Sequence, residues 1–266
     1  MASKRKFRAR QMLGKYRIES RLSSGPRADV YSAFDTIHGV KVALKIANPD
    51  IVEDNFLDEF RHEARLSARM EHPNVLPVQN ASFIDDYFVI AMRLGGETLA
   101  DRMKRRMTSA TALDFTTQAL AAVAHAHANH IIHCDVKPEN FIVFPGNRLR
   151  LTDFGFSKVA ARHQLKASGS GTLGYLAPEQ ALGRPMFQSD VFALGLVIYQ
   201  MFSGHLPDYP YKWPMAGYDK IRSKLRRRTI VWLRKALEFR HQDRYHDAVV
   251  MEKAFQEIRL KLTKRD

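Results

Sequence analysis

Residues 133–140 concentrate acidic, amide and lysine side chains, and Asp153 follows closely. Between them, two apolar-rich runs flank the turn residues 145–147, Pro-Gly-Asn, which is typical of a short hairpin. Because a hairpin brings its two ends together, we expect Asn140 and Asp153 to lie side by side. An Asn and an Asp so placed form an oxygen-rich pair suited to Mg²⁺, which takes few protein ligands plus phosphate oxygens. A nucleotide, metal ions and a hydroxyl group could meet here.

This arrangement resembles the catalytic and metal-binding loops of the eukaryotic-type serine/threonine protein kinases. The family pattern is H-R-D-x-K-P-x-N followed by D-F-G, and every position matches except Cys134, where the family has arginine. Lysine and proline after the aspartate are the serine/threonine form of the motif. The resemblance implies four roles: catalytic base for Asp135, contact with the transferred phosphoryl group for Lys137, and Mg²⁺ ligands for Asn140 and Asp153.

Two further segments match the family's phosphate-binding elements. Residues 22–30 stand where the family has G-x-G-x-x-G-x-V, and retain Gly25 and Val30 of that pattern; glycines there let backbone N–H groups approach the phosphates. Lys45 lies in a strand pattern with apolar neighbours, where an ammonium group is costly unless paired, and Glu63 is its expected partner. By resemblance, Lys45 holds the α- and β-phosphates of ATP and Glu63 orients it.

The adenine of ATP is expected to contact apolar residues of two strands. Ala43 precedes the lysine in the Val-Ala-Leu-Lys run. Counting back from Gly-Glu-Thr-Leu at residues 96–99 places Ala91 at the gatekeeper position and Leu94 in the hinge. A shift of one residue would make Ile90 the gatekeeper.

The segment after Asp-Phe-Gly closes at Ala-Pro-Glu, which ends at Glu179, and residues 171–175 resemble the family's substrate-binding stretch. The resemblance implies that Thr172 bonds the catalytic base, that Glu179 forms a buried pair with Arg244, and that Asp190 accepts backbone N–H bonds from the catalytic loop. A buried carboxylate without such partners would be costly. These elements distinguish protein kinases from small-molecule phosphotransferases, so the expected substrates are Ser and Thr hydroxyls of proteins.

The elements that must position these residues are readable from periodicity and turns. Strand patterns occur at residues 16–19, 30–34 and 40–46, and around residues 85–86. Helical patterns occur at residues 54–70, 98–106, 110–129, 189–202, 228–238 and 249–262. We expect an α+β, bilobal protein-kinase-like fold: a basic, disordered arm at 1–12, a small β-rich N-lobe with one main helix at 13–94, and a larger α-helical C-lobe at 95–266. The kinase domain itself should span 13–262.

The amino-acid composition limits the class of protein and its location. The 266 residues are 45% hydrophobic and 26% charged, as in ordinary globular proteins. No apolar run is long enough to span a bilayer, and no apolar region follows the basic N-terminus, so we expect no membrane span and no secretory signal. A single cysteine excludes an intrachain disulfide framework and predicts a cytoplasmic protein.

The net charge of +14 is unusual, with basic clusters at residues 4–10, 104–106 and 224–228. They indicate either an acidic partner or only solvated faces and a flexible tail. No zinc-finger spacing or RNA-binding aromatic signature predicts a dedicated nucleic-acid motif. The histidines between residues 125 and 133 do not place three rings on one helical face, so packing and surface roles are expected rather than zinc.

Three functions remain open. The first is an active serine/threonine kinase that uses ATP and Mg²⁺. The second is a pseudokinase acting as a nucleotide-binding or scaffolding module, which the incomplete glycine loop, Cys134 and Ser67 (where the family packs a leucine) would suit. The third is a nucleic-acid-associated protein, which the charge would suit. The complete set of catalytic side chains favours the first.

Cys134 also bears on regulation. A cysteine cannot pair with an activation-segment phosphate as arginine can. Phosphorylation is therefore predicted not to be required through that route at any of the candidate positions, which are Ser157, Ser168, Ser170 and Thr172.

Overall fold

The computed structural model describes residues 7–25, 27–48, 56–154, 158–159 and 173–263. Its contacts divide the chain into two units. The first comprises Met1–Glu71 and Val75–Gly96, and the second comprises His72–Asn74 and Glu97–Asp266. Gly155 and the four candidate phosphorylation positions, Thr172 among them, lie outside the described residues.

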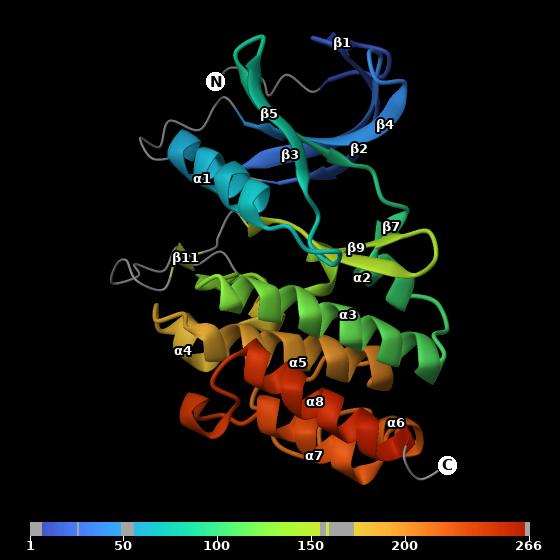
Figure 1. Ribbon diagram of the computed structural model, residues 1–266, viewed down its shortest axis with the longest axis vertical. Helices are drawn as coiled ribbons and strands as arrows, with labels where there is room; N and C mark the ends of the chain where they lie inside the picture. The colour runs from blue at the N-terminus through green and yellow to red at the C-terminus, as the bar shows by residue number, and fades with distance from the viewer. Residues whose placement is uncertain (1–6, 26, 49–55, 155–157, 160–172, 264–266) are drawn as a thin grey trace. The chain divides into compact units, whose positions relative to one another are not determined.

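An antiparallel sheet forms the first unit, with the strand order β1-β2-β3-β4-β6-β5 (Figure 1). Its elements are β1 (Met12–Leu13), β2 (Tyr16–Ser24), β3 (Ala28–Asp35), β4 (Val40–Ala47), α1 (Phe56–Arg69), β5 (Val78–Ile84) and β6 (Tyr87–Arg93). The strands are rich in β-branched and aromatic residues, which fit a pleated, half-buried surface. α1 packs against β5 and β6.

One face of this sheet carries the unit's hydrophobic core. Alternate residues of neighbouring strands meet there, because successive side chains of a strand point to opposite faces. The core comprises Leu13, Tyr16, Ile18, Tyr31, Ala33, Val42, Leu44, Ile46, Val89 and Ala91. The other face is therefore left to residues such as Lys45.

Residues 7–12 differ from the expected disordered arm. The Phe7 ring lies edge-on to Tyr31 at 5.6 Å and to Tyr87 at 5.0 Å between centroids, and the Arg10 N–H donates to the Ile18 carbonyl at 2.8 Å. Aromatic burial against the core fixes this segment, although its charge pattern predicts a solvated tail.

The β3–β4 turn is closed by a buried carboxylate. Asp35, 3% exposed, accepts the N–H groups of Ile37 and His38 at 3.0 Å and pairs with Lys15 at 2.8 Å. Burial alone would raise the pKa of Asp35, but hydrogen bonds from Lys15, His38 and the two backbone N–H groups outweigh it, so the pKa lies well below its ordinary value.

The second unit is mainly helical. Its helices are α2 (Leu99–Met103), α3 (Ser109–Ala128), α4 (Pro178–Ala181), α5 (Phe187–Ser203), α6 (Tyr218–Lys224), α7 (Arg227–Ala236) and α8 (Ala248–Thr263). Its strands are β7 (Glu97–Thr98), β8 (Ile131–Ile132), β9 (Phe141–Phe144), β10 (Arg148–Leu151) and β11 (Lys158–Val159). β9 and β10 form the predicted hairpin, with Phe141 opposite Leu151.

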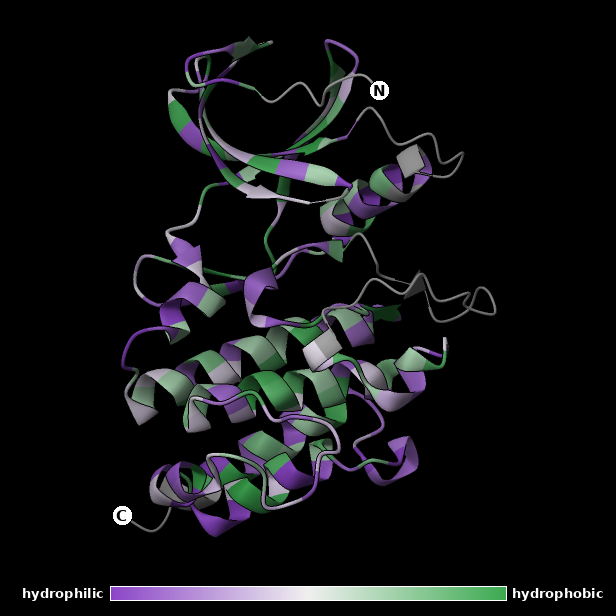
Figure 2. Cartoon of the chain, turned by 180° about the vertical axis from the view of Figure 1, so that it is seen from behind, coloured by the Kyte–Doolittle hydropathy of each residue, from purple (hydrophilic) through white to green (hydrophobic). Residues whose placement is uncertain are grey.

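Helix α5 is the centre of this unit, because it is apolar on all sides and almost entirely buried. α3, α7 and α8 pack against it, and Figure 2 shows hydrophobic and hydrophilic bands alternating along the surrounding helices. The sequence predicts α3, α5, α7 and α8 to within two residues at each end, but not the short helices α4 and α6. Among the helices within the described residues, none is long and apolar enough to cross a membrane.

Candidate active site

The first unit holds an ion pair on the open face of its sheet. Val30, Lys45 and Ile90 stand opposite one another on β3, β4 and β6, so their side chains share one face. The Lys45 Nζ donates to both carboxylate oxygens of Glu63 at 2.7 Å. Both side chains are largely buried, 13% and 5% exposed. The partner predicted from the cost of a buried ammonium group is therefore present.

The register corrects one expected adenine contact. Ala91 stands opposite Leu44, in the row next to that of Lys45, and belongs to the hydrophobic core on the other face of the sheet. Its side chain cannot line the face that carries Lys45, because a shift of one residue moves a strand's side chain across the sheet. The alternative, Ile90, lies on the Lys45 face, and so does Ala43, two residues before the lysine.

Gly25 lies at the hairpin between β2 and β3. Its N–H donates to the Ala28 carbonyl at 3.0 Å, and a Cβ built on Gly25 would lie 3.0 Å from that same oxygen. Ser24 closes the hairpin from the side by donating its hydroxyl to Asp29 at 2.7 Å. The one glycine kept from the family pattern therefore stands where the backbone is tightest. Pro26 lies outside the described residues.

In the second unit, two predicted side chains, those of Lys137 and Asn140, meet at the carboxylate of a third, Asp135. The Lys137 Nζ lies 2.7 Å from the Oδ2 of Asp135. The Asn140 Nδ2 donates to the backbone carbonyl of Asp135 at 2.8 Å and to its Oδ2 at 3.0 Å. Asp135 is 6% exposed, so these contacts hold its carboxylate in one orientation.

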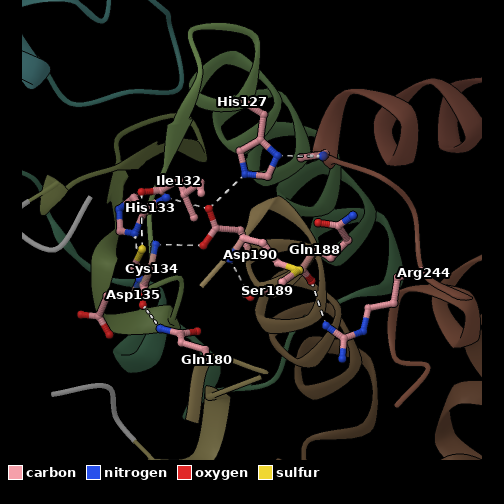
Figure 3. Close-up of polar contacts among 12 residues, drawn as sticks. His127, Ile132, His133, Cys134, Asp135, Gln180, Gln188, Ser189, Asp190 and Arg244 are labelled. Carbon is pink, nitrogen blue, oxygen red and sulfur yellow. Dashed lines mark hydrogen bonds and ion pairs between the residues drawn. The ribbon is translucent and has the colours of Figure 1, made fainter. Parts of the chain in front are cut away.

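Asp190 anchors the backbone of this loop (Figure 3). Its two carboxylate oxygens accept the backbone N–H of His133 at 2.6 Å and that of Cys134 at 2.9 Å. Cys134 has a φ of 66°, a left-handed conformation that costs energy for any residue with a Cβ. The buried Asp190 carboxylate stabilises this strained peptide directly before Asp135.

His127 completes the support of Asp190, a role that sequence reasoning did not assign. Its Nδ1 accepts the backbone N–H of Ala248 at 2.9 Å, and a backbone N–H can only donate. The proton therefore lies on Nε2, which donates to Asp190 at 3.0 Å. The ring thus links the start of α8 to α5 (Figure 3). The only sequence signal is a histidine on the buried side of a long helix.

The β9–β10 hairpin brings Asp153, the second candidate ligand of Mg²⁺, next to Asn140. The Thr152 N–H donates to the Asn140 carbonyl at 2.9 Å, so Asp153 follows directly after the residue opposite Asn140. The His133 Nε2 bonds the Thr152 carbonyl at 3.1 Å. Phe154 is fully buried with its ring edge-on to His133 at 4.8 Å.

The donor set at this position fits Mg²⁺. The side-chain hydrogen bonds of Asn140 to Asp135 both use its Nδ2, which leaves the Oδ1 as the atom able to bind a metal. Together with the Asp153 carboxylate it gives oxygen ligands only and few of them, as Mg²⁺ prefers when phosphate and water complete the shell.

The predicted buried pair of Glu179 and Arg244 is present. Arg244, whose side chain is fully buried, donates to the two carboxylate oxygens at 2.8 and 3.2 Å and to the carbonyls of Gln188, Glu238 and Phe239. Burial lowers the pKa of Arg244, and Glu179 opposes that shift. All five guanidinium N–H groups are thereby satisfied.

Gln180, which sequence reasoning missed, links this region to the catalytic loop. Its Nε2 donates to the Cys134 carbonyl at 2.5 Å, so both ends of the strained Cys134 backbone are held by α4 and α5 (Figure 3). Cys134 as a whole is 9% exposed, and its Sγ lies 3.6 Å from the Ile132 carbonyl oxygen.

In a comparison with models of known protein families, residues 16–259 match the protein kinase domain. The chain therefore belongs to the protein kinase family, and its motifs are those of the eukaryotic-type serine/threonine branch.

Particular relatives support this assignment. The chain is 33% identical over 205 residues to the serine/threonine-protein kinase PrkC of Bacillus subtilis, a match that covers 74% of this chain and 32% of PrkC. It is 35% identical over 207 residues to the serine/threonine-protein kinase PknA of Mycobacterium tuberculosis, covering 73% of this chain and 48% of PknA. The matches thus span at most about half the length of these relatives.

A solved structure shows the fold. The crystal structure of the Mycobacterium tuberculosis PknI kinase domain superimposes with a TM-score of 0.71 and covers 95% of this chain and 99% of its own, at 24% identity. The α+β kinase fold with a β-rich N-lobe and a helical C-lobe, expected from the sequence, is confirmed.

Proposed function

We propose that this chain is an ATP-dependent protein kinase that transfers the γ-phosphoryl group of ATP to Ser and Thr hydroxyls of protein substrates. The observation that carries the proposal is the Asp135 carboxylate, oriented by Lys137 at 2.7 Å and Asn140 at 3.0 Å in a loop that Asp190 fixes. A pseudokinase has no need of such an arrangement. The proposed kinase domain spans residues 13–262.

Phosphoryl transfer depends on positioning and charge stabilisation more than on covalent chemistry. In the proposed mechanism, Asp135 orients the substrate hydroxyl and accepts its proton, and Lys137 balances charge on the transferred group. Lys45, held by Glu63, binds the α- and β-phosphates. Mg²⁺, bound by Asn140 and Asp153, would neutralise the phosphate charge.

The proposed adenine and phosphate contacts follow from the strand register. Val30 and Ala43 are assigned to the nucleotide because they share the Lys45 face, and Gly25 because it forms the tight hairpin. Leu94, which follows β6, is assigned to the hinge. Ile90 replaces Ala91 as the proposed gatekeeper.

The test is transfer of labelled phosphate from ATP, with Mg²⁺, to a generic basic protein, followed by phosphoamino-acid analysis. Asp135→Asn and Lys45→Met should each abolish transfer while the protein still folds, and the label should be on Ser or Thr. Undiminished activity in both variants would contradict the assignment.

We further propose that activity does not depend on an activation-segment phosphate bound at position 134. The buried Cys134 thiol offers no positive charge for such a phosphate. Phosphatase-treated protein should keep its activity; a large loss that one phosphorylated residue of the segment reverses would refute this point.

A further inference from the structure

Helices α6 and α7 carry an unusual concentration of positive charge. The 21 residues of the segment 220–240 include nine basic residues and one acidic residue. All nine basic residues are exposed, and five of them are called here the α6–α7 basic surface: Lys220, Arg222, Arg226, Arg227 and Arg228. In Figure 2, α7, the lowest helix of the view, is largely hydrophilic on its outer side.

The cations of this surface are not neutralised within the molecule. Among the described residues, none of the five forms an ion pair with a carboxylate. The basic cluster beside α2 differs, since Lys104 pairs with Asp101 at 2.8 Å and Arg105 with Glu97 at 2.6 Å. The α6–α7 basic surface therefore presents an uncompensated positive potential to solvent.

Local helix stability does not explain these arginines. Arg226 is the N-cap of α7 and makes no side-chain cap bond, and no acidic residue lies in the first turn. Positive charge at a helix N-terminus opposes the helix dipole. Instead, α7 is stabilised by its buried face, where Trp232 donates its Nε1–H to the Met251 carbonyl at 3.0 Å and packs on Phe255.

The chain enters this surface from a connection that contacts the segment expected to bind substrate. The connection from α5 to α6 packs on the residues just before Ala-Pro-Glu: the Tyr211 hydroxyl donates to the Gly174 carbonyl at 3.4 Å, and a Cβ on Gly174 would lie 2.7 Å from Leu206. The Lys224 Nζ ties α6 back to α5 through the Phe202 carbonyl at 2.7 Å. A chain bound at the residues before Ala-Pro-Glu could continue onto the basic surface.

We propose that the α6–α7 basic surface docks an acidic tract of the protein substrate, and thereby selects substrates that carry such a tract apart from the phosphorylated Ser or Thr. This inference rests on the proposed function. Charge complementarity and continuity with the substrate-binding segment favour a protein partner. A membrane is disfavoured because the apolar face of α7 is buried against α8. On α6 and α7, which carry the basic surface and lie wholly within the described residues, Val231 is the one large apolar side chain that is exposed.

Binding can be measured without catalysis. The probe is a fluorescent peptide with a run of glutamates and no hydroxyl residue, and the readout is anisotropy at low and at high salt. The variant R226Q/R227Q/R228Q should bind about tenfold more weakly than wild type, since each exposed charge contact contributes little alone, and high salt should remove the difference. The control R106Q/R148Q/K253Q removes the same charge from exposed sites elsewhere and should bind like wild type.

Kinetics test the consequence for selectivity. For a Ser peptide with the acidic tract, the triple α7 variant should raise KM about tenfold and leave kcat unchanged, while the same peptide with glutamines should not distinguish the proteins. The proposal would be overturned if the control variant showed the same rise in KM for the acidic peptide. It would also be overturned if wild type had the same KM for the acidic and the glutamine peptide. Binding to anionic vesicles or to single-stranded RNA that α7 substitution abolishes, without any peptide preference, would also overturn it. Absence of transfer with intact acidic-peptide binding would instead refute the proposed function alone.

Discussion

Replacing Asp190 by asparagine should weaken both the fold and catalysis, because one buried carboxylate holds the strained start of the catalytic loop. Its Oδ2 accepts two donors, the His133 N–H and the His127 Nε2–H, and its Oδ1 accepts the Cys134 N–H. An asparagine has one acceptor oxygen. Placed at Oδ2, it keeps two bonds and turns its NH₂ group toward the Cys134 N–H.

The magnitude follows from that geometry. One charge-assisted hydrogen bond is lost, at about 1.5–3 kcal/mol, and the two that remain become weaker neutral bonds. We expect the free energy of unfolding in Asp190→Asn to fall by about 3 kcal/mol. The Cys134 backbone, released from its left-handed φ of 66°, should relax and displace Asp135, which lowers kcat at least about tenfold.

Urea unfolding measures the first effect, and peptide phosphorylation at saturating ATP and peptide measures the second. The control is Asp243→Asn, an exposed acidic residue in the same unit, which should leave both quantities unchanged. A free energy of unfolding within about 0.5 kcal/mol of wild type, the range usual for surface substitutions, together with an unchanged kcat would refute this account of Asp190.

Three further predictions concern the other buried charges. Arg244→Lys should lower the free energy of unfolding by about 2–4 kcal/mol, because an ammonium group can keep at most three of the five guanidinium bonds; the exposed Arg240→Lys is the matched control, and equal unfolding curves would contradict the reasoning. Glu63→Gln should raise the KM for ATP about tenfold, since Lys45 loses the charge that orients it; an unchanged KM and kcat would count against the pair's role. The folded pKa of Asp35 is depressed, so its contribution to stability is present above the ordinary carboxyl pKa of about 4 and is lost as the pH falls from there toward the folded value. Urea unfolding between pH 5 and pH 2 should therefore show a shallower loss of stability in Asp35→Asn than in wild type, and parallel curves would refute this.

Part of the site could be predicted from the sequence because burying a charged side chain without a partner is costly in free energy. A lysine among apolar strand residues requires a partner, and Glu63 is that partner. The pairing of Glu179 with Arg244 was implied by the family resemblance, and the cost of an unpaired buried carboxylate agrees with it. The Pro-Gly-Asn turn predicts the β9–β10 hairpin because its geometry is local. Long helices are likewise predictable because their apolar period extends over several turns.

The features that could not be predicted from the sequence depend on contacts between segments far apart in the chain. The face on which Ala91 lies depends on strand register, and a shift of one residue reverses it. The position of Phe7 depends on two tyrosines from other strands. Helix α6 is short and basic, so it has too few turns for a periodic signal and depends on packing. The cytoplasmic location remains a prediction from the single cysteine.

Asp135 is proposed to act on the substrate hydroxyl during phosphoryl transfer, and a single-turnover experiment tests this role. Wild-type protein and Asp135→Asn, with matched unfolding midpoints, are loaded with ATP and Mg²⁺ and mixed with excess Ser peptide, and peptide phosphorylation is followed in time. We expect equal ATP binding in the two proteins and a rate of transfer at least about a hundredfold lower in the variant, because a general base is lost. Equal transfer rates at equal ATP occupancy would contradict it.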